Sequence, residues 1–208
     1  MASTELEDRQ NREILDLFPR QGDWTVEEYL RLDTMRLVEF TQGFLEILPM
    51  PDEIHQDIAV WIHDRVREFL AKRGAGVTKP SPFKIRIDAE RFREPDICIL
   101  LDENDPRRAV EFWGGADVCF EVVSRDNPAR DYARKRIDYA AAAVKEYWIV
   151  DPQTQRVTLL ELAGTEFVER GVFVSGQTAV SSAMNGFTLD VSACFAAAAN
   201  VAKNRQPL

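Results

Sequence analysis

The longest regular pattern of apolar residues in the chain has helical spacing. It covers residues 53–73, and Gly74 and Gly76 follow it. Apolar residues at this spacing form one stripe along a helix, and glycine commonly ends a helix because it adopts positive φ without a steric penalty. The pattern predicts a long helix that packs on a core through Ile54, Ile58, Trp61, Ile62, Val66, Phe69 and Leu70.

Shorter apolar runs separated by turn residues predict β-strands. The runs at 37–41 and 44–48 flank Gln42-Gly43, which indicates a hairpin. Glu39 and Glu46 fall on these two strands, and we expect both side chains to face solvent. The other runs predicted as strands are 83–87, 94–100, 117–124, 144–151, 156–162 and 166–175.

Four further stretches are predicted to be helical, namely 3–17, 24–35, 129–143 and 190–202. Thr25 is followed three residues later by Glu28, which is the capping-box arrangement at a helix start. We expect the first helix to be a polar appendage and the last one to consist of small residues.

Two of the predicted core strands carry an acid. In EPDICIL, Pro95 favours an extended backbone before it, and Asp96 opens a run of β-branched and aliphatic residues. In DVCFEVVS, alternation with period two places Cys119, Glu121 and Val123 on one face. An unpaired buried carboxylate costs several kcal/mol or takes up a proton. The two acids are therefore expected to share a positive group, either a divalent cation or a lysine.

The predicted helix after the second acid is basic. It carries Arg130, Arg134, Lys135 and Arg136. One interpretation is a solvated helix face on which Asp131 and Lys135 form an i, i+4 ion pair worth a few tenths of a kcal/mol. The other is that the basic helix serves the two acids beside it.

The order of these motifs resembles a known family. The PD of EPDICIL, the run FEVVS, the spacing D-x-x-x-K-x-x-x-Y at Asp131, Lys135 and Tyr139, and the run EYWIVDP are similar to the Uma-type restriction endonucleases of the PD-(D/E)XK nuclease superfamily. The resemblance spans the chain from Thr25 to Leu189. It implies an α/β (α+β) fold with a restriction-endonuclease-like core, a mixed β-sheet flanked by helices in the order αβββαβ. An N-terminal helix and hairpin precede this core, and further strands follow it.

The resemblance also implies a catalytic site made of Asp96, Glu121 and Lys135. In the superfamily the lysine normally lies two residues after the second acid, where this chain has Val123. In Uma-type members the lysine has moved to the following helix, which here carries Lys135. The family also has a histidine at the start of the long helix, so we expect His55 as a further metal ligand.

Phosphodiester hydrolysis requires a nucleophilic water and stabilisation of the charge that builds on the phosphate. Asp96 and Glu121 offer oxygen ligands suited to Mg²⁺ or Mn²⁺. Lys135 would orient the attacking water, and Arg130 and Arg134 would contact backbone phosphates. We expect a metal-dependent endonuclease that acts on nucleic acid, with DNA as the first choice. A homodimer is expected, because one site per chain cuts two strands most simply with two-fold symmetry.

Composition adjusts this interpretation in two ways. The chain has 208 residues, which suits a single domain over 23–208 with residues 1–22 as an appendage. Its formal net charge of -9 argues against binding nucleic acid through overall charge, although residues 125–136 are locally basic.

Location is predicted from the apolar runs, the start of the chain and the cysteines. No run reaches the ~20 apolar residues of a membrane-spanning helix, and the start MASTELEDRQ is too acidic for a signal peptide. We expect a cytoplasmic protein whose three cysteines are reduced and buried, namely Cys98, Cys119 and Cys194.

Two alternatives to a nuclease stay open. A non-cleaving module that binds nucleic acid or protein would keep the nuclease fold, and it would explain both Val123 and the acidic net charge. In a purely structural domain, the acids and the basic helix would form only an internal salt-bridge network. Metal binding at Asp96 separates the structural domain from the other two, and cleavage separates the nuclease from the binding module.

Overall fold

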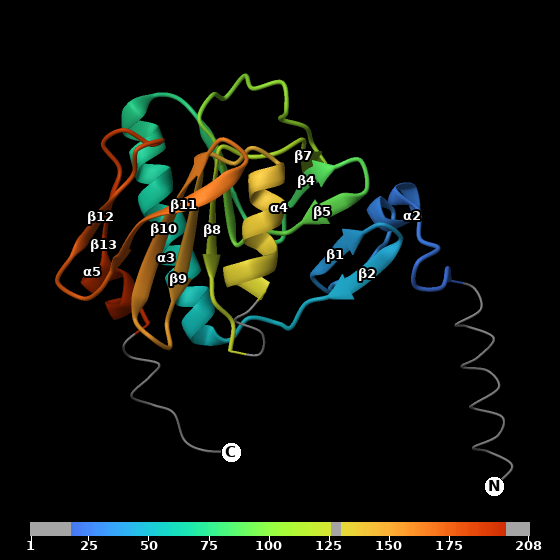
Figure 1. Ribbon diagram of the computed structural model, residues 1–208, viewed down its shortest axis with the longest axis horizontal. Helices are drawn as coiled ribbons and strands as arrows, with labels where there is room; N and C mark the ends of the chain where they lie inside the picture. The colour runs from blue at the N-terminus through green and yellow to red at the C-terminus, as the bar shows by residue number, and fades with distance from the viewer. Residues whose placement is uncertain (1–17, 126–129, 199–208) are drawn as a thin grey trace, which may run out of the picture.

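The computed structural model describes residues 18–125 and 130–198 (Figure 1). The helix predicted at 3–17 and the end of the helix predicted at 190–202 lie outside these residues.

A six-stranded mixed sheet forms the centre of the molecule (Figure 1). Its strand order is β11-β10-β9-β8-β6-β3. The neighbours β8 and β9 are parallel, and the other neighbouring pairs are antiparallel. The strands are β3 (Val77–Pro80), β6 (Ile97–Leu100), β8 (Val118–Val122), β9 (Glu146–Asp151), β10 (Arg156–Ala163) and β11 (Glu166–Phe173).

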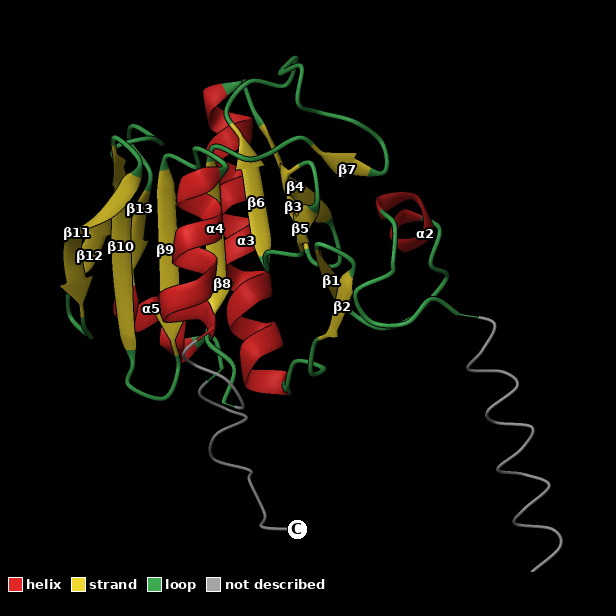
Figure 2. Cartoon of the chain, turned by 45° about the vertical axis from the view of Figure 1, so that its right-hand side comes forward, coloured by secondary structure: helices red, strands yellow, loops and turns green. Residues whose placement is uncertain are grey.

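Helices α3 (Glu53–Arg73) and α4 (Lys135–Ala141) lie against this sheet (Figure 2). They pack on it through different sets of strand residues. On β8, Phe120 belongs to the core that contains the apolar stripe of α3. Cys119 and Val123 belong to the core that contains Tyr139 of α4. This is the alternation predicted from the sequence, and it directs the face that carries Glu121 toward α4.

A second, five-stranded sheet lies beside the first, with the order β2-β1-β5-β4-β7. Its strands are β1 (Val38–Thr41), β2 (Phe44–Ile47), β4 (Lys84–Asp88), β5 (Arg91–Arg93) and β7 (Phe112–Trp113). The predicted hairpin is confirmed as β1 and β2. Tyr29, Phe40 and Phe92 form its small core with Val38, and Tyr29 comes from α2 (Val26–Leu30). Helix α2 has the predicted capping box, but it ends at Leu30 rather than at 35.

The C-terminal part adds a two-stranded sheet of β12 (Thr178–Val180) and β13 (Thr188–Asp190), followed by α5 (Val191–Ala196). Asp190 caps α5 by accepting a hydrogen bond from the Ala193 N–H at 2.9 Å. None of the helices among the described residues combines the length and the apolar composition needed to cross a membrane.

Two sequence-based expectations about strands are corrected. The strand predicted at 83–87 belongs to the smaller sheet, and β3 takes its place in the larger one. Along the chain, the elements of the core therefore follow in the order α3, β3, β6, β8, α4, β9. The prediction that Glu39 faces solvent is wrong, because its side chain is buried and lies near Lys135. Strands β3, β5, β7, β12 and β13 were not predicted at all.

Candidate functional site

Asp96 connects three elements at the edge of the site. It directly precedes β6, and its Oδ2 accepts a hydrogen bond from the Val122 N–H of β8 at 2.7 Å. Its Oδ1 lies 3.0 Å from Nε2 of His55, in the first turn of α3. That turn is fixed by the N-cap Asp52, which accepts a hydrogen bond from the His55 N–H at 2.9 Å. The predicted pair of Asp96 and His55 therefore meets in space.

Glu121 and Lys135 form the centre of the site. Glu121 Oε2 lies 2.7 Å from Lys135 Nζ, and the hydroxyl of Tyr139 donates a hydrogen bond to Glu121 Oε1. All three side chains are buried. The three motif residues of the α4 region, Asp131, Lys135 and Tyr139, thus converge with the second acid of the core strands.

A π-helical turn, η1 (Arg130–Arg134), leads directly into α4. Single π turns inside helices often occur at functional sites, because they change which side chains face inward. Here both Arg130 and Asp131 are buried, and Asp131 Oδ1 lies 3.4 Å from Lys135 Nζ. The interpretation of Asp131 and Lys135 as a solvated surface pair is therefore wrong, because both side chains are only 2% exposed.

Glu39 is a site residue that the sequence-based analysis missed. Its carboxylate lies 3.9 Å from Lys135 Nζ and 3.6 Å from Nε of Arg93, and it accepts a hydrogen bond from the Glu94 N–H. Alternation placed Glu39 on the polar face of its hairpin. Nothing in that short strand indicates that the polar face is covered by the basic helix.

Arg93 fixes the position of α4. Its guanidinium contacts Asp138 through Nε at 2.8 Å and through Nη2 at 2.7 Å, and its Nη1 donates to the carbonyl of Phe40. Asp138 lies one turn after Lys135. This buried contact joins the second sheet to α4 and holds Lys135 over Glu121.

A small cavity of about 30 Å³ opens at the point where these residues meet. That volume holds roughly one water molecule. Four acidic residues and two permanent cations line this cavity. The acids are Glu94, Asp96, Glu121 and Asp131, and the cations are Arg130 and Lys135.

The residues at this cavity fit a divalent ion in donor chemistry, charge and space. Asp131 Oδ1 is buried and has no hydrogen-bond partner among the described residues. Within 18–125 and 130–198, no three His, Cys, Asp or Glu side chains are grouped as a ready metal cage. Magnesium does not require one, since it commonly binds one or two carboxylates and keeps several waters.

The two acids of the core strands have opposite pKa shifts. Burial alone would raise the pKa of Asp96, but His55, Lys135 and the Val122 N–H outweigh it and hold that pKa below its usual range. For Glu121, burial and the nearby Asp96 raise the pKa above its usual range although Lys135 opposes this. Asp96 is therefore the stably ionised member of the pair.

The two cationic side chains beside these acids are also shifted. Burial disfavours the charge on Lys135, yet the surrounding carboxylates, led by Glu121, raise its pKa above the usual range. Burial likewise opposes the charge on His55, and the Asp96 carboxylate more than compensates, so that its pKa is raised. Lys135 is a permanent cation at neutral pH and cannot act as a base.

The two predicted phosphate contacts lie on one side of the site and share a partner. Arg130 is buried, with Nη1 3.8 Å from Glu46 Oε1, and Arg134 forms an ion pair with the other oxygen of the same carboxylate. Only Arg134 is substantially exposed, at 47% of its side chain. Of the two, Arg134 is the one that a strand of nucleic acid can reach.

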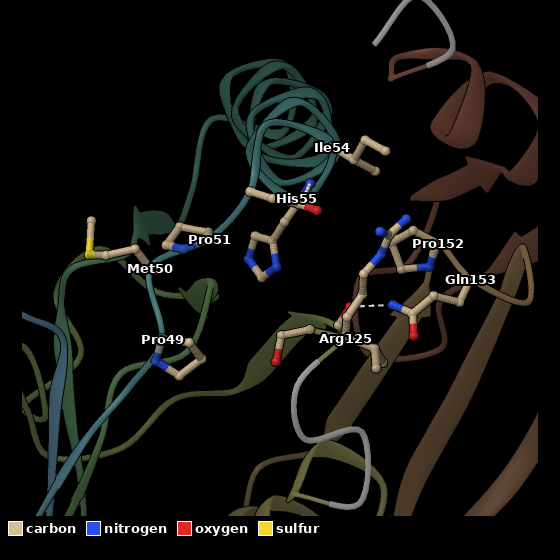
Figure 3. Close-up of a pocket in the computed structure, with 11 residues that line it drawn as sticks. Pro49, Met50, Pro51, Ile54, His55, Arg125, Pro152 and Gln153 are labelled. Carbon is tan, nitrogen blue, oxygen red and sulfur yellow. Dashed lines mark hydrogen bonds between the residues drawn. The ribbon is translucent and has the colours of Figure 1, made fainter. Parts of the chain in front are cut away.

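A second cavity of about 190 Å³ adjoins the first and shares His55, Pro49, Pro51 and Ser124 with it. Figure 3 shows the ring of His55 between the segment that carries Pro49 to Pro51 and the turn that carries Pro152 and Gln153.

Known proteins resemble the chain in sequence and in fold. Residues 26–192 match the model of the Uma2 family, described as "Putative restriction endonuclease". A crystal structure of a putative nuclease belonging to DUF820 from Anabaena variabilis ATCC 29413 has a similar fold. It superposes with a TM-score of 0.69 at 18% identity, and the alignment covers 84% of this chain and 98% of that one. No curated protein matches the chain. The family match covers most of the chain, so the protein belongs to the Uma2 family of putative restriction endonucleases.

Proposed function

We propose that the protein is a divalent-metal-dependent nuclease that hydrolyses phosphodiester bonds, with DNA as its substrate. The observation that carries this proposal is the convergence of Asp96, Glu121 and Lys135, from three separate elements, on one small acidic cavity. The family to which the chain belongs supports it.

Asp96 and Glu121 would hold the ion, which we take to be Mg²⁺ or Mn²⁺, and His55 stands beside Asp96 as a further ligand. When bound, such an ion supplies Lewis-acid stabilisation of the phosphate charge and makes water more acidic. The backbone N–H of Val122 keeps the Asp96 carboxylate aimed at the cavity.

Lys135 is proposed to act on the phosphate and the attacking water as a donor of hydrogen bonds. Its raised pKa keeps the ammonium charged, and its position 2.7 Å from Glu121 places that charge at the cavity. A compact cation in a dry site stabilises developing negative charge far better than one in water. Arg134 would contact a backbone phosphate after leaving Glu46.

The first prediction tests the two carboxylates. Asp96→Asn and Glu121→Gln remove charge with little change in volume, so each is expected to lower metal-dependent cleavage of DNA by at least on the order of 10²-fold while the fold is kept. Gel assays with Mg²⁺ and Mn²⁺, circular dichroism and calorimetric metal titration are the measurements. Asp64→Asn, on the exposed face of α3, is the matched control.

Each outcome selects one function. Cleavage that is unchanged in either variant rejects the site. Metal and DNA binding by the parent without any cleavage would favour the non-cleaving module. Absence of metal binding in the parent would favour a structural salt-bridge network.

We also propose that the protein acts as a homodimer in the cytoplasm. Two sites related by two-fold symmetry suit the two antiparallel strands of a duplex. The described cysteines Cys98, Cys119 and Cys194 are free and buried, which suits a reducing compartment. Light scattering is expected to give the mass of two chains, and a monomer at all working concentrations would contradict the dimer.

A further inference from the structure

We propose that the cavity between the β2–α3 segment and the end of β9 is a nucleobase subsite. It would hold one base of the DNA strand, turned out of the stack, beside the phosphate that is cut. This inference rests on the proposed nuclease function. It adds to that function a binding site for one base of the substrate.

The position of the cavity is the first argument. His55 and Ser124 line both this cavity and the small acidic one, and Pro49 and Pro51 do the same. A group bound here therefore sits directly next to the carboxylates Asp96 and Glu121. In a nucleic acid, the group next to a phosphate is a nucleoside.

The walls are the second argument. Figure 3 shows two walls with His55 between them, one built from Pro49, Met50 and Pro51 and the other including Pro152. Ile54 of α3 lines the same cavity. Proline rings are rigid and apolar, so they lose little conformational freedom when a flat ring packs on them. A base has two flat apolar faces, and a base turned out of the stack is commonly held between aromatic or apolar side chains.

The polar atoms are the third argument. Ser124 Oγ and His55 Nδ1 are buried and have no hydrogen-bond partner among the described residues. An unsatisfied buried polar atom carries a free-energy cost that a ligand's hydrogen bond would remove. Gln153 is held beside them, because its Nε2 donates to the Val123 carbonyl at 3.3 Å (Figure 3). A base edge offers the donors and acceptors that these atoms lack.

Charge decides between a base and a second phosphate. The cavity is lined by one permanent cation, Arg125, and by one carboxylate, Asp52, while the third titratable side chain, His55, is paired with Asp96. A phosphate subsite would require an excess of cations or several inward N–H groups. A nearly neutral cavity with apolar walls fits an uncharged heterocycle instead.

The test uses the wild-type protein with a chelator, so that the strand stays intact. The probe is a short single-stranded DNA that carries one 2-aminopurine, moved along the strand position by position. The fluorescence of this base rises when it leaves the stack. We expect a rise of several-fold at a single position, next to the bond that is cut when metal is added.

Two substitutions of the same kind locate the base. Ile54→Trp fills the cavity and should abolish the rise and weaken binding about tenfold, within the range measured for one stacked base. Ile137→Trp, on α4 at a side chain 68% exposed, is the matched control and should leave both unchanged. A strand that lacks the base at this position should bind the wild type about tenfold more weakly than the intact strand does. Ile54→Trp should bind the two strands equally well.

The outcomes separate this inference from the nuclease function. Asp96-dependent cleavage with no fluorescence rise at any position would keep the nuclease and overturn the base subsite, as would a rise that persists in Ile54→Trp. Failure of the wild type to bind or cut nucleic acid overturns both. If Ile54→Trp does not fold, the loss of affinity for the strand that lacks the base decides the question with the wild type alone.

Discussion

Lys135 is the residue on which the charge balance of the site depends. Its ammonium lies 2.7 Å from Glu121, 3.4 Å from Asp131 and 3.9 Å from Glu39, and all of these side chains are buried. A buried carboxylate without a counter-charge is costly. Without a metal ion, the charge of Lys135 offsets the cost of burying these carboxylates. This structural role is additional to any role in catalysis.

Lys135→Met tests the catalytic role, because it keeps the length of the stem and removes the charge. Cleavage is expected to fall on the order of 10²-fold or more through loss of a positioned cation at the phosphate. Metal binding should persist or tighten, because the lysine charge no longer competes with the metal ion for the carboxylates. Single-turnover cleavage and calorimetric titration measure the two effects. Lys72→Met, on an exposed side chain of α3, is the matched control.

A second variant checks whether the lysine has moved from its usual place. Val123 lies on the same strand face as Glu121, two residues further on, as the superfamily's lysine does. Val123→Lys combined with Lys135→Met should recover part of the lost activity if the core accepts the longer side chain. Full activity of Lys135→Met alone would instead show that the role of Lys135 is purely structural.

At the level of single residues, the sequence predicted those acids that interrupt apolar strands. Asp96 and Glu121 stand out because a charge in a core strand requires a reason. Glu39 could not be found in this way. It alternates correctly with Val38 and Phe40, so its burial depends on where α4 packs, and that is a tertiary contact which local periodicity does not encode.

At the level of elements, long patterns were predicted well and short ones were not. Helix α3 spans the predicted 53–73, because its apolar stripe continues over many turns. Strands β5 and β7 have three and two residues, too few for any period to show. The π turn η1 was predicted as ordinary helix, because the spacing of apolar residues over so few positions does not distinguish a π turn from an α turn.

Asp117 directly precedes β8, and its side chain contacts other segments of the chain. The stability that these contacts provide is expected to depend on pH. Its carboxylate accepts hydrogen bonds from the Leu101 N–H and from Arg107, and Lys145 Nζ lies 3.1 Å away. Burial would raise the pKa of Asp117, but these three partners hold it below its usual range. A lowered folded-state pKa means that the stabilisation is present above the unfolded pKa of about 3.9 and is lost as the pH falls through the folded value.

Asp117→Asn should therefore lower the free energy of unfolding by about 1–2 kcal/mol at pH 7, a value reduced for the partial exposure of Arg107 and Lys145. The difference from wild type should shrink as the pH falls below about 4. Urea unfolding at several pH values measures it. The exposed Asp102→Asn in the same loop is the control, and a difference that does not change with pH would contradict the ion-pair explanation.

At the scale of the whole molecule, the formal net charge of -9 has to be reconciled with a nucleic-acid substrate. Many of the described cations are already neutralised inside the fold. Arg93 is paired with Asp138, Lys135 with Glu121, and Arg107 with Asp117. Within residues 125–136, Arg130 and Lys135 are buried, so this locally basic stretch offers a strand of DNA fewer free charges than its sequence suggests. The division of the chain at residue 22 stays a prediction.

This charge distribution predicts a weak dependence of DNA binding on salt. The logarithm of the binding constant falls with the logarithm of salt concentration by about 0.9 per phosphate that the protein neutralises on a duplex. With Arg134 and one or two further cations within reach, the slope should be roughly −2, whereas a strongly basic DNA-binding face gives values several times larger. Arg134→Ala should reduce the slope by about one unit. Arg170→Ala removes a matched arginine, also exposed and paired with a glutamate, and should leave the slope unchanged. A steep slope in the wild type would show that a second chain or a rearranged surface supplies the missing cations, and an equal effect of the two arginine variants would remove Arg134 from the binding site.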